Sequence, residues 1–444
     1  MAPRPPNPIE KILRALKRVI PKPLFRAAQP YYHYLLAFVS ASLFDFPSRE
    51  IRVVAITGTK GKTTVAELVN AILEAAGYKT ALLSTIHFKT GDVTAANTYK
   101  MTVPGRFFVQ KFLRDAVNAK CDWAVVEMTS EAVKQHRHAF IDFDALIFTN
   151  LAHEHIESHG SYEQYRAEKV KLARTVARSR KPGTLIIANA DDKEASFFLE
   201  AGAKRSLPYR LADGAPYETT SESSVFTFRG RTIRMRLPGI FNIMNALGAA
   251  TFAEAEGIPL DAIVKGLSEV SLVRGRVEYV RLNTFDGAEA KQPFSVVVDY
   301  AHTPESLEAL YELFPETHII AVLGNTGGGR DTWKRPVMAG IAEKHANEII
   351  LTNEDPYDED PQAILDAMAE GIEDKVKLSI ILDRREAIHE ALERAKRRSA
   401  SEQPLPVAVL ITGKGTDPYI MGANGSKQPW DDATVAREEL EKIV

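Results

Sequence analysis

Cysteine is almost absent from this sequence, because Cys121 is the single one among 444 residues. One thiol excludes an internal disulfide framework and any zinc site built from several cysteines, and it fits a reducing compartment. An excess of charge of one sign is also lacking, since 56 basic and 58 acidic side chains leave a formal net charge of −2. Nothing global therefore points to nucleic acid as a partner, and any basic binding site must be local.

Long hydrophobic runs are missing as well. The most apolar stretch near the start, residues 31–44 (YYHYLLAFVSASLF), is shorter than the ~20 residues that a membrane-spanning helix needs. Prolines interrupt the basic start MAPRPPNPIEKILRALKRVIPKP, so no cleavable signal peptide is evident. We expect a cytoplasmic monomer in which residues 31–44 form a helix packed on the next domain. A peripheral contact with a membrane surface, helped by the basic segment 11–22, is the alternative.

Short apolar runs alternate with helical patterns along two stretches of the chain. The first contains IRVVAITG, KTALLSTI, WAVVEMTS, DALIFTNL and GTLIIANAD, and the second contains FSVVVDYA, HIIAVLGN, NEIILTNE, KLSIILDR and PVAVLITG. Strands in series with helices between them predict parallel, doubly wound sheets, so the fold class is α/β. We expect a short N-terminal segment over residues 1–50, a central domain over residues 51–273 and a Rossmann-like domain over residues 274–444.

The segment VVAITGTKGKTTVAEL, residues 53–68, joins a predicted strand to a predicted helix through a loop of Gly, Lys and Thr. Such a turn presents backbone N–H groups to a phosphate, and its glycines allow close approach. The lysine before the paired threonines reaches the β- and γ-phosphates, and the next hydroxyl can bind Mg²⁺. The central domain is therefore predicted to be a P-loop-type ATPase domain. Its phosphate-binding residues are Gly58, Thr59, Gly61, Lys62, Thr63 and Thr64.

The loop GTKGKTT resembles the phosphate loop of the Mur ligases, which also has one leading glycine fewer than the generic pattern. That family includes folylpolyglutamate synthetase and cyanophycin synthetase, and it couples ATP cleavage to amide-bond formation through an acyl phosphate. The resemblance covers roughly residues 51–420, and DYAHTP points to the branch that adds the third amino acid of the peptidoglycan stem peptide. It implies an ATP- and Mg²⁺-dependent ligase acting on a UDP-N-acetylmuramoyl-dipeptide in cell-wall biogenesis, and hence in cell shape and division.

The resemblance also implies a metal site and a modified lysine. Glu127, at the end of the apolar run WAVVE, matches the family's Mg²⁺ ligand beside Thr63, and His155 matches the ligand of a second metal. Lys169 in YRAEK matches a lysine that the family carbamylates, in which a neutral amine takes up CO₂ and becomes an anionic ligand. Without the resemblance, Glu127 would be a solvated loop residue and Lys169 an exposed lysine on an amphipathic helix. His153 and His159 are interpreted as ordinary loop residues.

Further nucleotide contacts follow from the same resemblance. Asn242 and Asn245 share one face of a predicted helix and match adenine contacts, although an N-cap and a polar surface residue would be the plain interpretation. Arg276 in VRGRVE matches an arginine that meets the γ-phosphate. Asp299 and His302 in VVVDYAHTP match ribose and phosphate contacts. With Lys62 and Lys169, Arg276 and His302 are the expected catalytic residues.

Substrate contacts are implied in both domains. On the muramyl side they are Thr102, Ser130, Gln135 and Arg137, and in the C-terminal domain they are Arg330, Asp331, Glu354, Asp355, Tyr357, Gly413 and Asp417. The loop GNTGGGRDTWKRP that carries the first two of the C-terminal set resembles the Gly-rich loop of the tripeptide-adding branch. A flexible surface loop is the alternative interpretation of its glycines.

The loop TNEDPYDEDP departs from the pattern of the diaminopimelate-adding relatives, which carry Asp-Asn-Pro-Arg there. Tyr357 stands in the place of the arginine and cannot form a bidentate ionic contact with a distal carboxylate. The acidic residues around it favour a substrate with a free ammonium, such as L-lysine or another diamino acid. A loop whose charges are merely solvated is the alternative.

The N-terminus departs from the family pattern as well, because Gly58 comes too early for the usual domain that holds the uridine diphosphate. We expect either a reduced substrate-binding domain or another acceptor, such as a lipid-linked muramyl peptide or a different carboxylate. A folylpolyglutamate-type ligase, a P-loop switch whose hydrolysis is indifferent to amino acids, and a catalytically inactive binding module are further alternatives.

Overall fold

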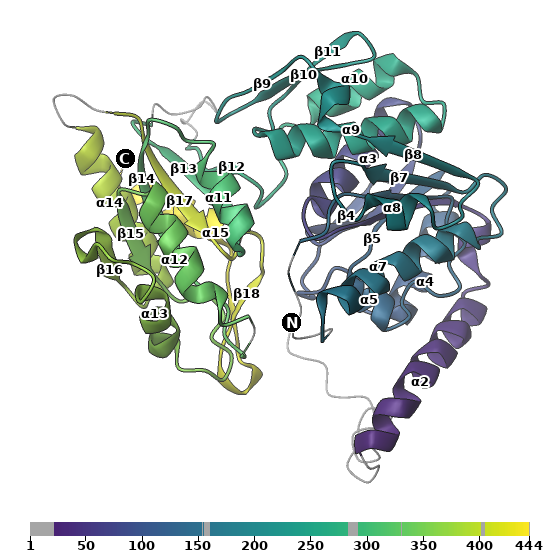
Figure 1. Cartoon of the computed structure of the whole chain (residues 1–444), viewed down its shortest axis with the longest axis horizontal. Coiled ribbons are helices and arrows are strands. Elements are labelled where there is room, and N and C mark those ends of the chain that lie inside the picture. The colour runs from purple at the N-terminus through teal and green to yellow at the C-terminus, as the bar shows by residue number, and fades with distance from the viewer. Residues whose placement is uncertain are drawn as a thin grey trace.

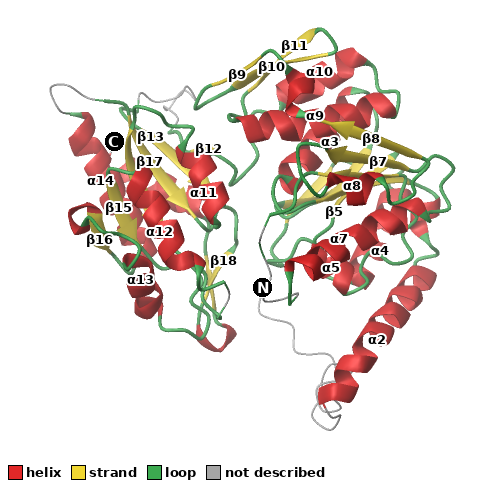
Figure 2. Cartoon of the chain, in the orientation of Figure 1, coloured by secondary structure: helices red, strands yellow, loops and turns green. Residues whose placement is uncertain are grey.

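The computed structural model describes residues 22–152, 154, 160–282, 292–329, 331–400 and 405–443. Two α/β bodies, each a sheet with helices packed on it, lie next to each other, and helix α2 (Lys22–Leu43) extends away from the first (Figures 1 and 2). A one-turn helix, η1 (Pro47–Arg49), connects α2 to the first sheet. The predicted α/β class with a parallel-sheet central body and a second α/β body is confirmed. The domain limits near residues 50 and 273 stay predictions.

The first body is built on an eight-stranded sheet in the order β4-β3-β2-β5-β1-β6-β7-β8. Its strands are β1 (Arg52–Thr57), β2 (Thr80–Leu83), β3 (His87–Thr90), β4 (Val93–Ala96), β5 (Trp123–Glu127), β6 (Ala145–Phe148), β7 (Leu185–Asn189) and β8 (Arg205–Tyr209). All neighbours pair in parallel except β2-β3 and β3-β4, which form an antiparallel edge. The central strands are buried along their length, because helices cover both faces.

The helices of this body separate into two groups with separate apolar clusters. One group is α3 (Lys62–Ala75), α9 (Ile240–Ala255) and α10 (Leu260–Glu269), which share a core with the small sheet β9 (Tyr217–Thr219), β10 (Ser224–Phe228) and β11 (Arg231–Met235). The other group is α4 (Arg106–Asn118), α5 (Ser130–Lys134), α7 (Tyr162–Ala177) and α8 (Ala195–Leu199). A short 3-10 turn, η2 (Leu211–Gly214), lies between β8 and β9. α3 therefore starts at the carboxyl end of a central strand with its body fixed in the core.

The second body is a six-stranded sheet in the order β12-β13-β17-β14-β15-β16, parallel except for β12. Its strands are β12 (Glu278–Tyr279), β13 (Ser295–Asp299), β14 (His318–Leu323), β15 (Glu348–Leu351), β16 (Leu378–Ile380) and β17 (Val407–Thr412). Its helices are α11 (Pro304–Tyr311), α12 (Lys334–His345), α13 (Pro361–Ala369), α14 (Arg384–Ser399) and α15 (Asp432–Ile443). Short elements complete it: η3 (Lys375–Lys377), η4 (Ala423–Gly425) and the ribbon β18 (Tyr419–Met421) with β19 (Lys427–Pro429).

The later part of α2 packs on α4, as expected for residues 31–44. Ala37, Ser40 and Ala41 are buried there, and Ser40 Oγ donates a hydrogen bond to Arg106 O (3.1 Å). Another face of α2 exposes large apolar side chains, with Tyr31 80%, Leu35 59% and Leu43 68% exposed. Of the helices in the described part of the chain, none combines the length and apolarity needed to cross a membrane.

Candidate active site

The phosphate loop connects β1 to α3 and needs its two glycines. Gly58 has φ +151° and Gly61, the residue before α3, has φ +78°, a region that favours glycine. A Cβ at Gly58 would collide with Thr149 Oγ1, and a Cβ at Gly61 would collide with Asn245 Oδ1. The loop is thus pressed between β6 and α9, and its backbone lies where a phosphate can meet the N-terminus of α3.

Lys62, the first residue of α3, folds back over this loop. Its Nζ donates hydrogen bonds to Gly58 O (3.1 Å) and Thr59 O (2.8 Å). Burial lowers the pKa of Lys62, and the nearby carboxylates of Glu127 and Glu154 act in the opposite direction. The Lys62 ammonium is therefore held next to the loop without a salt-bridge partner among the described residues. It can form an ion pair with a bound phosphate.

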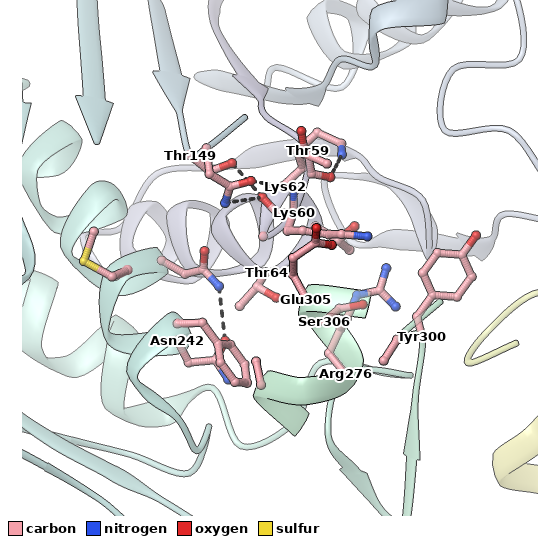
Figure 3. A pocket seen from close by; sticks show the side chains of 18 of the residues that line it. Thr59, Lys60, Lys62, Thr64, Thr149, Asn242, Arg276, Tyr300, Glu305 and Ser306 are labelled. Carbon is pink, nitrogen blue, oxygen red and sulfur yellow. Dashed lines mark hydrogen bonds between the residues drawn. The ribbon is translucent and has the colours of Figure 1, made fainter. Parts of the chain in front are cut away.

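The loop forms one wall of a cavity of about 480 Å³ whose other wall comes from the second body. Figure 3 shows Thr59 and Lys62 on one side of the cavity and Arg276 on the opposite side. The size is ordinary for a ligand pocket between domains. The predicted nucleotide contacts that line it are Thr59, Gly61, Lys62, Thr63, Thr64, Asn242, Asn245, Arg276, Asp299 and His302. Residues up to 243 positions apart in the sequence thus face one cavity.

Glu127 and Thr63 lie together at the base of this cavity. Thr63 Oγ1 donates to Glu127 Oε2 (3.1 Å), which also accepts from Thr85 N (2.9 Å) and Thr85 Oγ1 (3.0 Å). A hydroxyl and a carboxylate beside a phosphate site suit Mg²⁺, which binds through one or two protein oxygens, phosphate oxygens and water. His155 lies outside the described residues, and within the described ranges no three His, Cys, Asp or Glu side chains converge.

Lys169 on α7 is buried, not exposed as an isolated helical lysine would be. Only 1% of the residue is accessible, and its Nζ donates a hydrogen bond to Gly58 O (2.6 Å) in the phosphate loop. Burial lowers the pKa of Lys169 well below its ordinary value, and the charge of Lys62 acts in the same direction. A neutral amine is the form that reacts with CO₂, so the environment fits carbamylation.

A second cluster joins the two bodies across the cavity, and the sequence analysis missed two of its members. Lys60 Nζ forms an ion pair with Glu154 Oε1 (2.8 Å), and His302 Nε2 lies 3.7 Å from the same oxygen. His302 Nδ1 lies 2.7 Å from Tyr300 O, and burial lowers the pKa of His302 well below its ordinary value. A neutral His302 then donates from Nδ1 and leaves Nε2 as an acceptor. The sequence signal that could have indicated this cluster was the additional lysine of the phosphate loop, Lys60.

The remaining nucleotide contacts are held by backbone groups, by an aromatic ring and by a hydrogen bond between two of their own side chains. Asp299 accepts from Val277 N and Ala301 N (both 2.7 Å), and burial raises the pKa of its carboxyl group. The Arg276 guanidinium lies over the Tyr300 ring, 4.7 Å from its centroid. On α9, Asn245 Nδ2 donates to Asn242 Oδ1 (3.2 Å) and Asn242 Nδ2 donates to Pro238 O (2.7 Å).

The predicted muramyl contacts are divided. Thr102 lines the cavity, where its Oγ1 lies 2.8 Å from Thr85 Oγ1. Ser130 starts α5 and is buried. Arg137 donates to Gln135 Oε1 (2.7 Å) and to Val103 O. Unlike Thr102, the residues Ser130, Gln135 and Arg137 do not line the cavity.

The acidic loop after β15 is largely engaged within the fold. Asp355 Oδ1 accepts from Lys414 Nζ (2.9 Å) and Met421 N (2.8 Å), and its other oxygen contacts Lys100. Burial would raise the pKa of Asp355, but Lys414 and Lys100 outweigh it and hold the pKa below its ordinary value. Asp358 accepts from Asn424 N (2.7 Å), and Asp360 caps α13. The acidic composition therefore overstates the charge that is free for a substrate.

Among the other predicted substrate contacts of the second body, Glu354 and Gly413 lie next to each other. Glu354 is buried, accepts from Thr326 Oγ1 (2.7 Å), and has a pKa raised by burial. Gly413 has φ +103°, and a Cβ there would collide with Glu354 Oε2. Tyr357 and Asp331 have positive φ, and Asp417 lies 3.5 Å from Lys414. Arg330 lies outside the described residues.

A phosphate loop on one α/β body, facing an arginine and a histidine from a second, defines an ATP-dependent ligase that works between two domains. The chain belongs to the Mur ligase family, which confirms the resemblance. Residues 56–253 match the Mur ligase middle domain, and residues 275–415 match the Mur ligase, glutamate ligase domain. Enzymes of this family use ATP and Mg²⁺ in general.

Two relatives match most of the chain. A UDP-N-acetylmuramyl-tripeptide synthetase of Roseiflexus sp. (strain RS-1) is 36% identical over 96% of this chain and 85% of its own length. A UDP-N-acetylmuramoyl-L-alanyl-D-glutamate--2,6-diaminopimelate ligase of Syntrophomonas wolfei is 35% identical over 91% of this chain and 81% of its own length.

Solved structures agree in fold. A UDP-N-acetylmuramoyl-L-alanyl-D-glutamate--2,6-diaminopimelate ligase gives a TM-score of 0.58 at 26% identity over 88% of this chain and 78% of the other. A folylpolyglutamate synthase of Mycobacterium tuberculosis, complexed with ADP and AMPPCP, gives 0.66 at 20% identity over 85% and 91%. The second likeness concerns the fold alone.

Proposed function

We propose that this enzyme adds an amino acid, a diamino acid in our interpretation, to a UDP-N-acetylmuramoyl-dipeptide through an acyl phosphate, in peptidoglycan precursor synthesis. The observation that carries the proposal is the cavity shared by both bodies, with Lys62 on one wall and Arg276 on the other. The relatives with 35–36% identity support the choice of substrates by the reactions in their names.

The residues of the cavity fit the two chemical steps. Lys62, Arg276 and the N-terminus of α3 neutralise the γ-phosphate as an oxygen of the substrate carboxylate bonds to its phosphorus and the bond to ADP breaks. The uncharged amine of the incoming amino acid then bonds to the carbonyl carbon, inorganic phosphate leaves, and the amine loses a proton. Thr63 and Glu127 would hold Mg²⁺, which supplies counter-charge beside the phosphates. Closure of the two bodies excludes water from the acyl phosphate.

Lys169 acts, in this proposal, as a carbamate. Its burial and its contact with the loop carbonyl of Gly58 place the middle of α7 at the phosphate site. An anionic carbamate at that position offsets the charges of Lys62 and a bound cation, and a protonated lysine would repel both.

Phosphate release is the test of the whole reaction. With ATP, Mg²⁺ and UDP-N-acetylmuramoyl-dipeptide, we expect release that requires one amino acid from a panel and is absent without the dipeptide. L-Lysine and diaminopimelate are the decisive members, because Tyr357 replaces an arginine that would bind a distal carboxylate. Turnover with diaminopimelate alone would contradict the preference for lysine.

Other results of this assay would redirect the assignment. ATP hydrolysis that no amino acid changes would indicate a P-loop switch. A folded protein that binds ATP but releases no phosphate would favour a lipid-linked or other carboxylate acceptor. Activity with a folate and glutamate would favour the folylpolyglutamate-type alternative.

The exposed face of α2 supports a peripheral membrane contact of an otherwise monomeric, cytoplasmic enzyme. We expect sedimentation with vesicles that contain phosphatidylserine, and we expect the double substitution Leu35→Glu and Phe38→Glu to reduce it several-fold, because both side chains are exposed and apolar. Val93→Glu, at an apolar residue that is 73% exposed on β4, is the matched control. Equal sedimentation of all three proteins, or a dimer that the α2 substitutions dissociate, would contradict the contact.

A further inference from the structure

Lys100 crosses from the first body to the second. It lies in the loop between β4 and α4, with φ +55°, and its side chain is 17% exposed. Its Nζ contacts Asp355 Oδ2 and lies 3.3 Å from Asp417 Oδ2 and 3.5 Å from Tyr419 O. These three oxygens match the three N–H bonds of an ammonium group, so the second body carries a complete ammonium site. We call these three oxygens the ammonium site.

Contacts other than those of Lys100 also hold the oxygens of the ammonium site in place. Lys414, which is fully buried, donates to Asp355 Oδ1 (2.9 Å) and Tyr419 O (2.7 Å). The carboxylates of Asp355 and Asp417 thus face the ammonium groups of Lys100 and Lys414, and departure of Lys100 would leave both carboxylates beside a single ammonium group. Burial would lower the pKa of Lys100, but Asp417 and Asp355 outweigh it and hold the pKa above its ordinary value.

The loop that carries Lys100 is also tied to the nucleotide cavity. Asn97 Nδ2 donates to Ser84 O (3.1 Å) and Met101 O (3.0 Å). Thr102, two residues after Lys100, contacts Thr85, whose hydroxyl and amide donate to Glu127. The position of Lys100 is therefore linked through short hydrogen bonds to the carboxylate beside the phosphate loop.

We propose that Lys100 determines substrate specificity by occupying the ammonium site until the cationic group of the incoming amino acid displaces it. A substrate with a primary ammonium restores the charge balance and the three hydrogen bonds. An amino acid without net charge cannot restore the charge balance, because the carboxylate beside its single ammonium cancels that charge and leaves the buried Asp355 and the partly buried Asp417 with one cation. The identity of the incoming group rests on the proposed function, but the exchange itself requires only a ligand of net positive charge that carries an ammonium group.

Calorimetric titration of the full chain tests the exchange without ATP or dipeptide, so that it reports even if the protein ligates nothing. The probes are L-lysine and 1,5-diaminopentane, with L-norleucine as the neutral analogue. We expect Lys100→Met and Lys100→Gln to bind both ammonium probes at least about fivefold more tightly than the unaltered chain, because no internal competitor remains. Norleucine should gain nothing.

Two controls accompany these variants. Lys100→Arg keeps a cation in the ammonium site and should bind the probes like the unaltered chain. Lys111→Met, at an exposed lysine on α4 that pairs with Asp115, should change nothing. A merely structural role of Lys100 predicts weaker binding on its removal. Unchanged or weaker binding of the ammonium probes to either neutral variant, or an equal gain for norleucine, would overturn the proposal, and a neutral variant that fails to fold leaves the other to decide.

Discussion

Lys62→Ala should lower the ligation rate at saturating substrates by ~10²–10³-fold, the usual cost of removing one charged group that stabilises a transition state. The Lys62 ammonium contacts only loop carbonyls in the described structure, at 2.8 Å and 3.1 Å, so it is free to follow the phosphate charge. The measurement is phosphate release under the conditions defined for the unaltered enzyme. The melting temperature should change little, because neither hydrogen bond joins separate elements.

The matched control is Lys111→Ala, which removes an exposed lysine far along the sequence from the loop. It should retain the full rate. A Lys62→Ala enzyme with unchanged turnover would refute the role of this lysine at the γ-phosphate, whatever the substrate.

Lys169→Ala should lower turnover by about 100-fold, as loss of a group that positions a metal site does. If the lysine is carbamylated, ¹³C-labelled CO₂ should give a carbamate signal in the unaltered enzyme that is absent from the variant. A short carboxylic acid added to the variant should restore part of the activity. Lys171→Ala, on the same helix but exposed and paired with Glu168, is the control and should keep both the signal and the rate.

The pH dependence of this lysine has a definite sign. Burial and the charge of Lys62 lower the pKa of Lys169, so the amine is uncharged at a lower pH than an ordinary lysine. Because only the uncharged amine takes up CO₂, the carbamate signal and the activity should fall together as the pH decreases through that pKa. A fully active enzyme without a carbamate signal would mean that the hydrogen bond to Gly58 O is the function of Lys169.

The sequence predicted what is local in the chain. The alternation of apolar runs and helical patterns yields both sheets, and the loop at residues 58–64 follows from its glycines, its lysine and the strand before it. The site could be predicted in part because several of its residues cluster in short motifs at strand ends, where a parallel sheet brings them together. Without the family pattern, the two asparagines of α9 would have been interpreted as an N-cap and a polar surface residue.

The remainder depends on pairs that are distant in sequence. Lys60 meets Glu154 across 94 positions, and Lys100 meets Asp355 across 255. No periodicity specifies such pairs, because the first follows from the packing of two loops of one sheet and the second from how two separately folded sheets face each other. The acidic loop shows the same limit, since composition suggested available charge where Lys414 and Lys100 already neutralise it. The burial of Lys169 likewise depends on α7 packing over the phosphate loop.

Because the cavity is divided between two bodies, the substrates that bind to it affect one another's affinity. Any ligand that draws the two walls together prepares the site for the next one. By thermodynamic linkage, the factor by which ATP raises the affinity for the amino acid must equal the factor by which the amino acid raises the affinity for ATP. Order of binding then needs no separate sensor, because the free energy of the proposed closure of the two bodies is shared among all the substrates.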